Sequence, residues 1–225
     1  MRILGVIPAF NEAGTVGLVV SGALRHLADV LVVDDGSTDD TVQKAKAAGA
    51  KVVSHAGNLG KGAAIKTGFD YAMKEGFDAV VTLDADTQHD PDEIPKLIDA
   101  ASGGAGIVIG SRLKDKEKIP KARYYTNMVG VGCISWRSKN RLLDSQSGFR
   151  LYRADVIRGM KFSGGRFETE TELLIRAGLR GFKIASVPVR TIYSEEITGR
   201  SHFRAVYDTY RICIVFLKSF FWFNP

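Results

Sequence analysis

Short runs rich in β-branched residues alternate along this chain with segments of helical composition, and no other feature limits the fold as much. This alternation predicts a largely parallel β-sheet with helices on its faces, which places the chain in the α/β class. In the first half, the predicted strands are Ile3 to Ile7, Val30 to Val33, Val52 to Ser54, Ala79 to Leu83 and Gly106 to Ile109. Two further strands, Ser147 to Tyr152 and Lys183 to Val189, are expected on either side of a helix at Glu170 to Leu179.

Two of the helices carry sequence signals at their starts. Ser37 is a predicted N-cap for a helix over Thr41 to Ala48. Further along, Asp90 is a predicted N-cap, Pro91 occupies the first helical position, and Glu93 stands where a capping-box acid belongs.

Length and composition favour one folded domain. A chain of 225 residues with 45% hydrophobic residues can bury one large core, whereas two half-sized domains would each struggle to do so. Its 31 basic and 25 acidic residues give a net charge of +6, which suits phosphate-bearing partners or an anionic membrane surface. No basic-aromatic RNA-binding motif accompanies that charge, so we expect no nucleic-acid partner. Cys133 and Cys213 are far apart in the sequence and indicate neither a disulfide framework nor a cysteine metal site, so a reducing cytoplasm is expected.

The sequence predicts peripheral rather than transmembrane association. Met1 to Pro8 is expected to be the first strand rather than a signal peptide, and no run of roughly twenty apolar residues follows anywhere. The stretch Ala122 to Asn140 mixes aromatics, small residues and arginines, and is a predicted helical lid or membrane-facing element. The aromatic C-terminal stretch, His202 to Phe223, is a predicted amphipathic helix at a membrane interface; the alternative is a helix packed on its own domain or on a dimer partner.

Acidic residues follow three of the predicted strands. Ligands of open parallel sheets bind beyond the carboxyl ends of the strands, so these acids mark the expected binding edge. The segments are Pro8 to Glu12, Asp34 to Ser37 and Asp84 to Gln88.

Asp84 and Asp86 stand two residues apart, which in extended backbone directs both side chains the same way. They are predicted to share Mg²⁺ or Mn²⁺, to which Gln88 would add an amide oxygen; the alternative is that these acids only cap turns. The segment Gly57 to Gly62 matches neither a P-loop nor a dinucleotide fingerprint, which argues against a P-loop NTPase and a dinucleotide oxidoreductase.

Together these segments resemble the family 2 glycosyltransferases of the GT-A fold. The matching motifs are Val6 to Glu12, Val32 to Asp39, Asn58 to Gly62 and Leu83 to Pro91. Three later segments, Gly110 to Arg112, Asp144 to Arg150 and Thr198 to Phe203, resemble the branch that acts on polyprenyl phosphates, typified by dolichol-phosphate mannose synthase. The glycosyltransferase domain would then span residues 1–201, with the C-terminal helix at 202–225.

The resemblance implies roles for particular residues. Metal binding would fall to Asp84, Asp86 and Gln88, and the residues implied in catalysis are Asp86, Asp144 and Arg112. The residues implied in donor binding are Pro8, Ala9, Asn11, Glu12, Asp35, Lys61, Asp84 and Ala85. The residues implied in binding the acceptor phosphate are Arg112, Arg123, Arg200 and Asn127, the last standing where the branch has a serine. The Gln-x-x-Arg-Trp signature of processive polysaccharide synthases is absent, which argues against polymer synthesis.

The resemblance also implies an activity. The chain is expected to transfer a hexose with inversion from a nucleotide-sugar to dolichyl or polyprenyl phosphate, on the cytoplasmic face of a membrane. GDP-mannose is the favoured donor and UDP-glucose the next, with Mg²⁺ or Mn²⁺ as cofactor and a small membrane subunit or a second copy of the chain as partner. Because a phosphate acceptor is already ionised near neutral pH, no strong base is needed. Asp144 would then orient the nucleophile; its alternative role is a turn residue before Gly148.

Other interpretations stay open at this level. One is a GT-A transferase with a soluble sugar or protein acceptor, which would need a true base such as Asp144. A second is a nucleotidyltransferase that forms nucleotide-sugars, although its glycine- and arginine-rich N-terminal loop is missing, and a third is a non-catalytic binding module. Glu168, Glu170 and Glu172 are interpreted as a charged helix start, and the four scattered histidines predict no histidine metal site.

Overall fold

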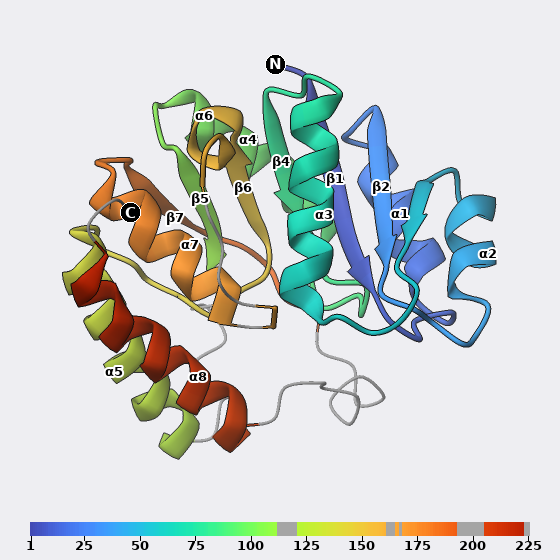
Figure 1. Cartoon of the computed structure of the whole chain (residues 1–225). Coiled ribbons are helices and arrows are strands. Elements are labelled where there is room, and N and C mark those ends of the chain that lie inside the picture. The colour runs from blue at the N-terminus through green and yellow to red at the C-terminus, as the bar shows by residue number, and fades with distance from the viewer. Residues whose placement is uncertain (112–120, 161–164, 167, 193–204, 223–225) are drawn as a thin grey trace.

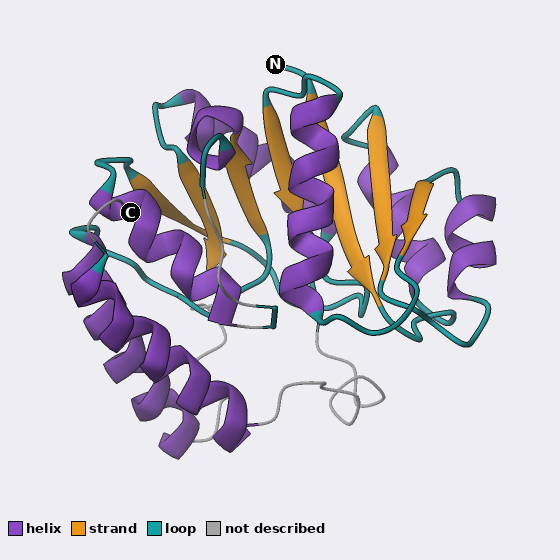
Figure 2. Ribbon diagram, viewed as in Figure 1, coloured by secondary structure: helices purple, strands orange, loops and turns teal. Residues whose placement is uncertain are grey.

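A seven-stranded sheet forms the centre of the protein (Figures 1 and 2). The computed structural model describes residues 1–111, 121–160, 165–166, 168–192 and 205–222, with side chains at 121–127 and 205–209 left aside. The strands are β1 (Ile3–Ala9), β2 (Asp29–Asp34), β3 (Lys51–Ser54), β4 (Ala79–Thr82), β5 (Ile107–Ser111), β6 (Arg150–Arg153) and β7 (Ile184–Pro188). Their order across the sheet is β3-β2-β1-β4-β6-β5-β7. All seven predicted strands are therefore present.

The sheet is mainly parallel, as the alternating sequence predicts. Only β6 runs against its neighbours β4 and β5, and the pairs β1–β2, β1–β4, β2–β3 and β5–β7 are parallel. In the register of β1 with β2, Ala9 stands opposite Asp34, and Val6 stands opposite Thr82 of β4. The carboxyl ends of β1, β2 and β4 therefore meet at one edge, with the acidic segments directly beyond it.

Helices cover both faces of the sheet (Figure 2). The α-helices are α1 (Val16–Leu24), α2 (Thr41–Ala47), α3 (Lys61–Lys74), α4 (Ile94–Ser102), α5 (Lys121–Ser138), α6 (Ala154–Ile157), α7 (Glu168–Leu179) and α8 (Ala205–Lys218), and two 3-10 turns are η1 (Pro91–Glu93) and η3 (Ser219–Phe221). One core lies between the sheet and α3 and α7, and includes Leu4, Phe69 and Leu173. The other lies between the sheet and α1 and α4, and includes Ile7 and Leu97. Alternate side chains of the strands thus supply two separate apolar layers.

The capping predictions were partly confirmed. Asp90 accepts a hydrogen bond from the Asp92 amide at 3.0 Å, but it opens the 3-10 turn η1, which leads into α4. The prediction of Ser37 as the N-cap of α2 was wrong, because Asp40 holds that position. The Ser37 hydroxyl instead accepts a hydrogen bond from the Asn11 amide at 2.9 Å. The capping-box role of Glu93 was also wrong, since its carboxylate binds Lys96 and Arg190 instead.

The interpretation of the three glutamates as a charged helix start is confirmed, with Glu168 and Glu170 in the first turn of α7. Helix α7 begins at Glu168, and all of its residues from Glu168 to Gly178 are buried. Glu168 forms an ion pair with Arg211 of α8, and Glu172 forms one with Arg176 at 2.7 Å. The acids are neutralised inside the protein rather than hydrated.

The α5 and α8 helices lie side by side at one end of the molecule (Figure 1). Arg137 of α5 donates to the Ser219 hydroxyl at 3.1 Å, and the Arg176 guanidinium lies 3.9 Å from the ring centroid of Trp222. Helix α8 therefore packs on α5 and α7. No helix in the described part of the chain has both the length and the apolar character needed to cross a membrane.

Candidate active site

The loops after β1 and β2 are joined by hydrogen bonds. The Asn11 side chain accepts from the Thr38 amide at 2.9 Å, and the Glu12 amide donates to the Thr41 hydroxyl at 2.8 Å. Asn11 has a positive φ of 56°, a left-handed conformation that asparagine tolerates better than most residues. The first two acidic segments therefore form one connected rim.

Asp35 holds the glycine-rich loop in place. Its carboxylate accepts from the amides of Leu59 at 2.9 Å and Gly60 at 2.7 Å, and it contacts His55 Nδ1 at 2.8 Å. His55 Nε2 in turn lies 2.9 Å from the Thr67 hydroxyl. Both carboxylate oxygens of Asp35 are thus engaged within the protein, at the position where the sequence predicts a donor contact.

Asp84 and Asp86 lie where the chain leaves β4. Burial, and then repulsion from Asp84, raises the pKa of Asp86 to about 6. The Asp86 carboxylate accepts from the Gln88 amide at 3.0 Å, which partly offsets these effects. The two carboxylates are therefore close enough to repel each other.

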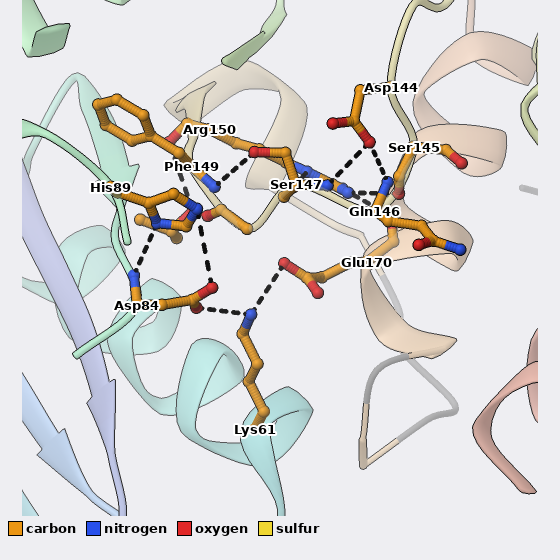
Figure 3. A network of polar contacts seen from close by, with 12 residues as sticks. Lys61, Asp84, His89, Asp144, Ser145, Gln146, Ser147, Phe149, Arg150 and Glu170 are labelled. Atoms are coloured by element: carbon orange, nitrogen blue, oxygen red, sulfur yellow. Dashed lines mark hydrogen bonds and ion pairs between the residues drawn. The ribbon is translucent and has the colours of Figure 1, made fainter. Parts of the chain in front are cut away.

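Lys61, the first residue of α3, connects Asp84 to α7 (Figure 3). Its ammonium lies 2.6 Å from Asp84 Oδ1 and 3.5 Å from Glu170 Oε1. Burial alone would lower the pKa of Lys61, but the two carboxylates outweigh it and raise that pKa above its ordinary value. The ammonium is accordingly charged and shared between two acids.

Gly148 and His89 enclose Asp84 from the other side. A β-carbon on Gly148 would lie 2.6 Å from Lys61 Nζ and 2.8 Å from Asp84 Oδ2, so only glycine leaves room for this ion pair. His89 is buried against Phe149, with 5.3 Å between ring centroids, and its Nδ1 accepts from the Asp84 amide at 3.2 Å. His89 thus fixes the backbone from which Asp84 projects.

The turn before β6 is built around two charged residues (Figure 3). The Asp144 carboxylate accepts from the amides of Gln146 at 2.8 Å and Ser147 at 3.2 Å. Arg150, fully buried, donates to the carbonyl oxygens of Ser145 at 2.8 Å and Glu170 at 2.9 Å. Asp144 therefore fills the turn role named as its alternative, and its catalytic role stays a prediction.

The structure brings together most of the residues predicted for donor and metal binding. Pro8, Ala9, Asn11, Glu12, Asp35, Lys61, Asp84, Ala85, Asp86 and Gln88 all lie at or just beyond the carboxyl ends of β1, β2 and β4 or at the start of α3. Arg112 and Arg200 lie outside the described residues, as do the side chains of Arg123 and Asn127 on α5. The predicted acceptor-phosphate group is therefore untested by the geometry.

Four residues of the site were not singled out for it from the sequence: Glu170, Gly148, His89 and His55. Glu170 carried a usable signal, because an acidic helix start that runs straight into Leu173, Leu174 and Ile175 is typical of an interior helix. The other three are recognisable only by their distances to Asp84, Lys61 and Asp35.

The carboxylate oxygens of Asp84 and Asp86 are suitable ligands for a hard divalent cation. Mg²⁺ and Mn²⁺ prefer oxygen ligands, and Mg²⁺ commonly binds through one or two carboxylates while substrate phosphates complete its shell. Across the described ranges, no group of three or more His, Cys, Asp or Glu side chains is arranged to hold a metal ion. Asp84 and Asp86 thus offer a partial shell, and a cation between them would relieve the repulsion that raises the pKa of Asp86.

Comparison with known proteins identifies the family. The family model described as Glycosyl transferase family 2 matches residues 6–172. A UDP-N-acetylglucosamine–dolichyl-phosphate N-acetylglucosaminyltransferase of Methanococcus voltae is 32% identical over 220 residues, covering 87% of each chain. An undecaprenyl-phosphate mannosyltransferase of Micrococcus luteus is 30% identical over 214 residues, covering 87% of this chain and 85% of the relative.

A solved structure supports the fold assignment. Glucosyl-3-phosphoglycerate synthase of Mycobacterium tuberculosis, in complex with Mg²⁺ and uridine diphosphate, superposes with a TM-score of 0.74 at 24% identity. The match covers 97% of this chain and 79% of that one, which confirms the expected GT-A fold. With the family model matched over most of its length, this chain belongs to the family 2 glycosyltransferases and is a glycosyltransferase.

Proposed function

We propose that this protein transfers a hexose from a nucleotide-sugar to a polyprenyl phosphate, with inversion at the anomeric carbon. The observation that carries the proposal is the pair Asp84 and Asp86 at the carboxyl edge of the sheet, beside the loops after β1 and β2. Relatives that differ in the sugar named, N-acetylglucosamine or mannose, both have a polyprenyl-type phosphate in their names. The acceptor class is therefore the better supported half of the reaction.

The donor would lie along the rim formed by the first two acidic segments. Pro8, Ala9 and Glu12 would contact the nucleotide from one loop, and the amides around Asp35 would contact it from the next. Asp84, Asp86 and Gln88 would hold Mg²⁺ or Mn²⁺, which supplies positive charge to the donor diphosphate as the sugar–phosphate bond breaks. Lys61, adjacent to Asp84, adds a second positive charge at the same place.

The acceptor would approach from the side of α5. Arg112, Arg123, Arg200 and Asn127 would hold its phosphate in line behind the anomeric carbon, since arginine pairs with phosphate through two parallel hydrogen bonds. The phosphate is itself the nucleophile and is ionised near neutral pH, its second pKa being about 6, so no side chain has to remove a proton. Asp144, beside the turn at Ser145, would orient the acceptor.

A membrane surface is the proposed location of the acceptor. The α5 and α8 pair, together with η3 at the end of α8, exposes Trp136, Leu217 and Phe221, with 68%, 62% and 74% of each residue accessible to water. Lys139 and Lys218 are exposed near these apolar side chains. Apolar side chains beside lysines are typical of a helix pair that lies in the interface of an anionic bilayer. We propose that this surface faces the cytoplasmic leaflet, with a homodimer or a small membrane subunit as further partner.

Transfer of radiolabelled sugar tests the proposal. The purified protein is incubated in detergent with GDP-mannose, UDP-glucose or UDP-N-acetylglucosamine and a polyprenyl phosphate, with Mn²⁺, with Mg²⁺ or with chelator. We expect a metal-dependent lipid product and propose GDP-mannose as the first donor to try. Binding of a nucleotide-sugar without lipid product would instead indicate a soluble sugar or protein acceptor, and transfer that persists in chelator would contradict the metal site.

The Asp86→Asn variant tests the proposed metal site. It keeps the size of the side chain and removes one charged ligand, so we expect a loss of about 100-fold or more in turnover, the order of magnitude for removing one charge-stabilising group from an enzyme active site. An Asp78→Asn variant serves as reference because Asp78 lies at the opposite end of the sheet, where it accepts from the Arg2 amide at 2.6 Å.

A further inference from the structure

Glu170 keeps a buried carboxylate oxygen without a hydrogen bond. The residue lies in the first turn of α7, and only 4% of it is exposed. Its Oε1 lies 3.5 Å from Lys61 Nζ and makes no hydrogen bond within the described part of the chain. A buried acceptor in this condition is costly to maintain, so its presence at a site requires an explanation.

The packing of α7 does not provide that explanation. The neighbouring acids on the same helix each have an arginine partner, which Glu170 lacks: Glu168 pairs with Arg211, although its Oε2 also makes no hydrogen bond within the described part of the chain, and Glu172 pairs with Arg176 at 2.7 Å. The ammonium of Lys61 lies nearer to Asp84, at 2.6 Å, than to Glu170. Lys61 thus places a positive charge beside Glu170 without making a hydrogen bond to its Oε1.

The location of this oxygen limits what can bind it. Figure 3 shows the Glu170 carboxylate directed toward Lys61, with Asp84 on the far side of the same ammonium. A phosphate oxygen at Glu170 would be repelled, and a neutral group with hydroxyl donors would be attracted. The hexose is the neutral, hydroxyl-rich part of the donor, and it is attached directly to the diphosphate that Asp84 and Asp86 would hold through the cation.

We infer that Glu170 accepts a hydrogen bond from a hydroxyl of the donor hexose and is a specificity-determining residue for the sugar. The inference rests on the proposed function, because it needs the diphosphate at Asp84 and Asp86. A site built to bind a hydroxyl discriminates strongly against an analogue that lacks it, since the buried acceptor is then left unpaired.

The inference is tested by comparing kcat/KM of the wild-type protein and the Glu170→Gln variant, each with the parent donor and with deoxy-sugar donors. The donor is the nucleotide-sugar that the wild-type protein turns over, together with its analogues in which one hydroxyl at a time is replaced by hydrogen. With the parent donor, we expect Glu170→Gln to lower kcat/KM by about 10- to 100-fold, the range for a hydrogen bond to a charged group. With one of the deoxy donors, the same substitution should change kcat/KM less than about 3-fold, because the contact is already absent.

Glu172→Gln is the matched control. Glu172 is fully buried on the same helix but binds Arg176, so its substitution should lower the melting temperature without distinguishing among the deoxy donors. Calorimetry adds a readout apart from turnover: Glu170→Gln should weaken binding of the nucleotide-sugar and leave binding of the nucleoside diphosphate alone unchanged.

The outcomes separate this inference from the proposed function. If wild-type protein transfers sugar but Glu170→Gln reduces kcat/KM equally for the parent and all deoxy donors, the inference fails and the proposed function stands. Equal weakening of nucleotide-sugar and nucleoside diphosphate binding would also overturn the inference. A wild-type protein that binds no nucleotide-sugar would overturn both.

Discussion

Single residues set the electrostatics at the sheet edge. Asp84 and Glu170 share the ammonium of Lys61, whereas Asp86 is repelled by Asp84 and by Glu12. A buried carboxylate that is repelled by its neighbours destabilises the folded state whenever it is ionised. The ligand-free protein therefore tolerates an unfavourable charge at the position where a divalent cation would bind.

This arrangement predicts a pH-dependent effect of Asp86→Asn on stability. The pKa of Asp86 is raised from 3.8 to about 6, so between these values the unfolded chain releases the proton more readily than the folded one. The contribution of this group to the free energy of unfolding is thus most favourable below about pH 4 and is lost as the pH rises through about 6. In chelator near pH 7.5, Asp86→Asn should raise the melting temperature by roughly 2–4 °C, the shift expected for about 1 kcal/mol in a domain of this size.

Thermal melts from about pH 4 to 8 measure this effect. The gain should shrink below pH 6 and vanish near pH 4, where both proteins carry a neutral side chain. A gain that stays constant over the whole range would contradict the role of the Asp86 charge. Adding Mn²⁺ near pH 7.5 should stabilise the wild-type protein more than the variant, because the cation binds only the folded state.

At the level of elements, the glycine-rich loop between β3 and α3 owes its position to β2. Asp35, directly after β2, accepts from the amides of Leu59 and Gly60, and Gly60 has a positive φ of 97° that suits glycine. The next residue, Lys61, begins α3. The amide of Gly62, which follows it, donates to the Gly165 carbonyl at 3.0 Å. The loop therefore links the second strand to the ion pair with Asp84.

His55→Ala is expected to loosen this loop. His55 contacts Asp35 at 2.8 Å and Thr67 at 2.9 Å, so its removal leaves the carboxylate free to reorient. Hydrogen exchange at the Leu59 and Gly60 amides should become about 10-fold faster, which corresponds to the loss of one hydrogen bond to a charged group. The measurement is amide exchange followed by NMR or mass spectrometry.

His26→Ala is the control for this prediction. His26 also pairs with an aspartate, since its Nε2 lies 2.8 Å from Asp92 Oδ1, but that pair lies between α1 and η1, away from the loop. Its removal should leave exchange at Leu59 and Gly60 unchanged. Similar exchange rates at these amides in both variants would show that His55 does not position the loop.

At the scale of the whole molecule, apolar exposure is concentrated at one end. The paired helices α5 and α8 lie at the opposite end of the molecule from α1 and α2 (Figure 1). The rings of Trp136 and Phe220 meet there at a tilt, with 5.8 Å between centroids, and Arg137 lies over the Phe220 ring at 5.1 Å. This surface lies away from the loop after β2, so a membrane and the proposed nucleotide would approach different parts of the protein.

Substituting the exposed side chains of this surface tests its proposed role. Leu217→Glu and Phe221→Glu together should lower binding to phosphatidylcholine–phosphatidylglycerol vesicles by at least about 10-fold, because each apolar side chain contributes about 1.5–3 kcal/mol when buried in lipid. Both residues are exposed, so the melting temperature should change little. Vesicle co-sedimentation measures the binding.

Leu18→Glu provides the reference for this experiment. Leu18 is 69% exposed on α1, at the other end of the molecule. Leu18→Glu therefore replaces an exposed apolar side chain with a carboxylate, as the two test substitutions do, but away from α5 and α8. Its vesicle binding should equal that of the wild type. If all variants bind equally, α5 and α8 do not form the membrane surface.

Local sequence patterns were enough to predict the class of sheet, all seven strands and the acidic segments at the carboxyl ends of three of them. Runs of β-branched residues and cap signals such as Asp90 are local, and parallel strands bring their carboxyl ends together whatever the details of packing. The site residues that belong to these segments, such as Asp84 and Asp86, could therefore be predicted from the chain alone.

The contacts among the remaining groups could not be predicted from the sequence, because they depend on tertiary packing. Glu170, Gly148 and Lys61 are far apart in the sequence, and their approach depends on β6 running antiparallel between β4 and β5 and on α7 being buried against the sheet. No local pattern encodes a distance of 3.5 Å between Glu170 and Lys61, because it results from the packing of α3 against α7. Propensity and periodicity place a residue on an element, whereas long-range packing decides which side chain it meets.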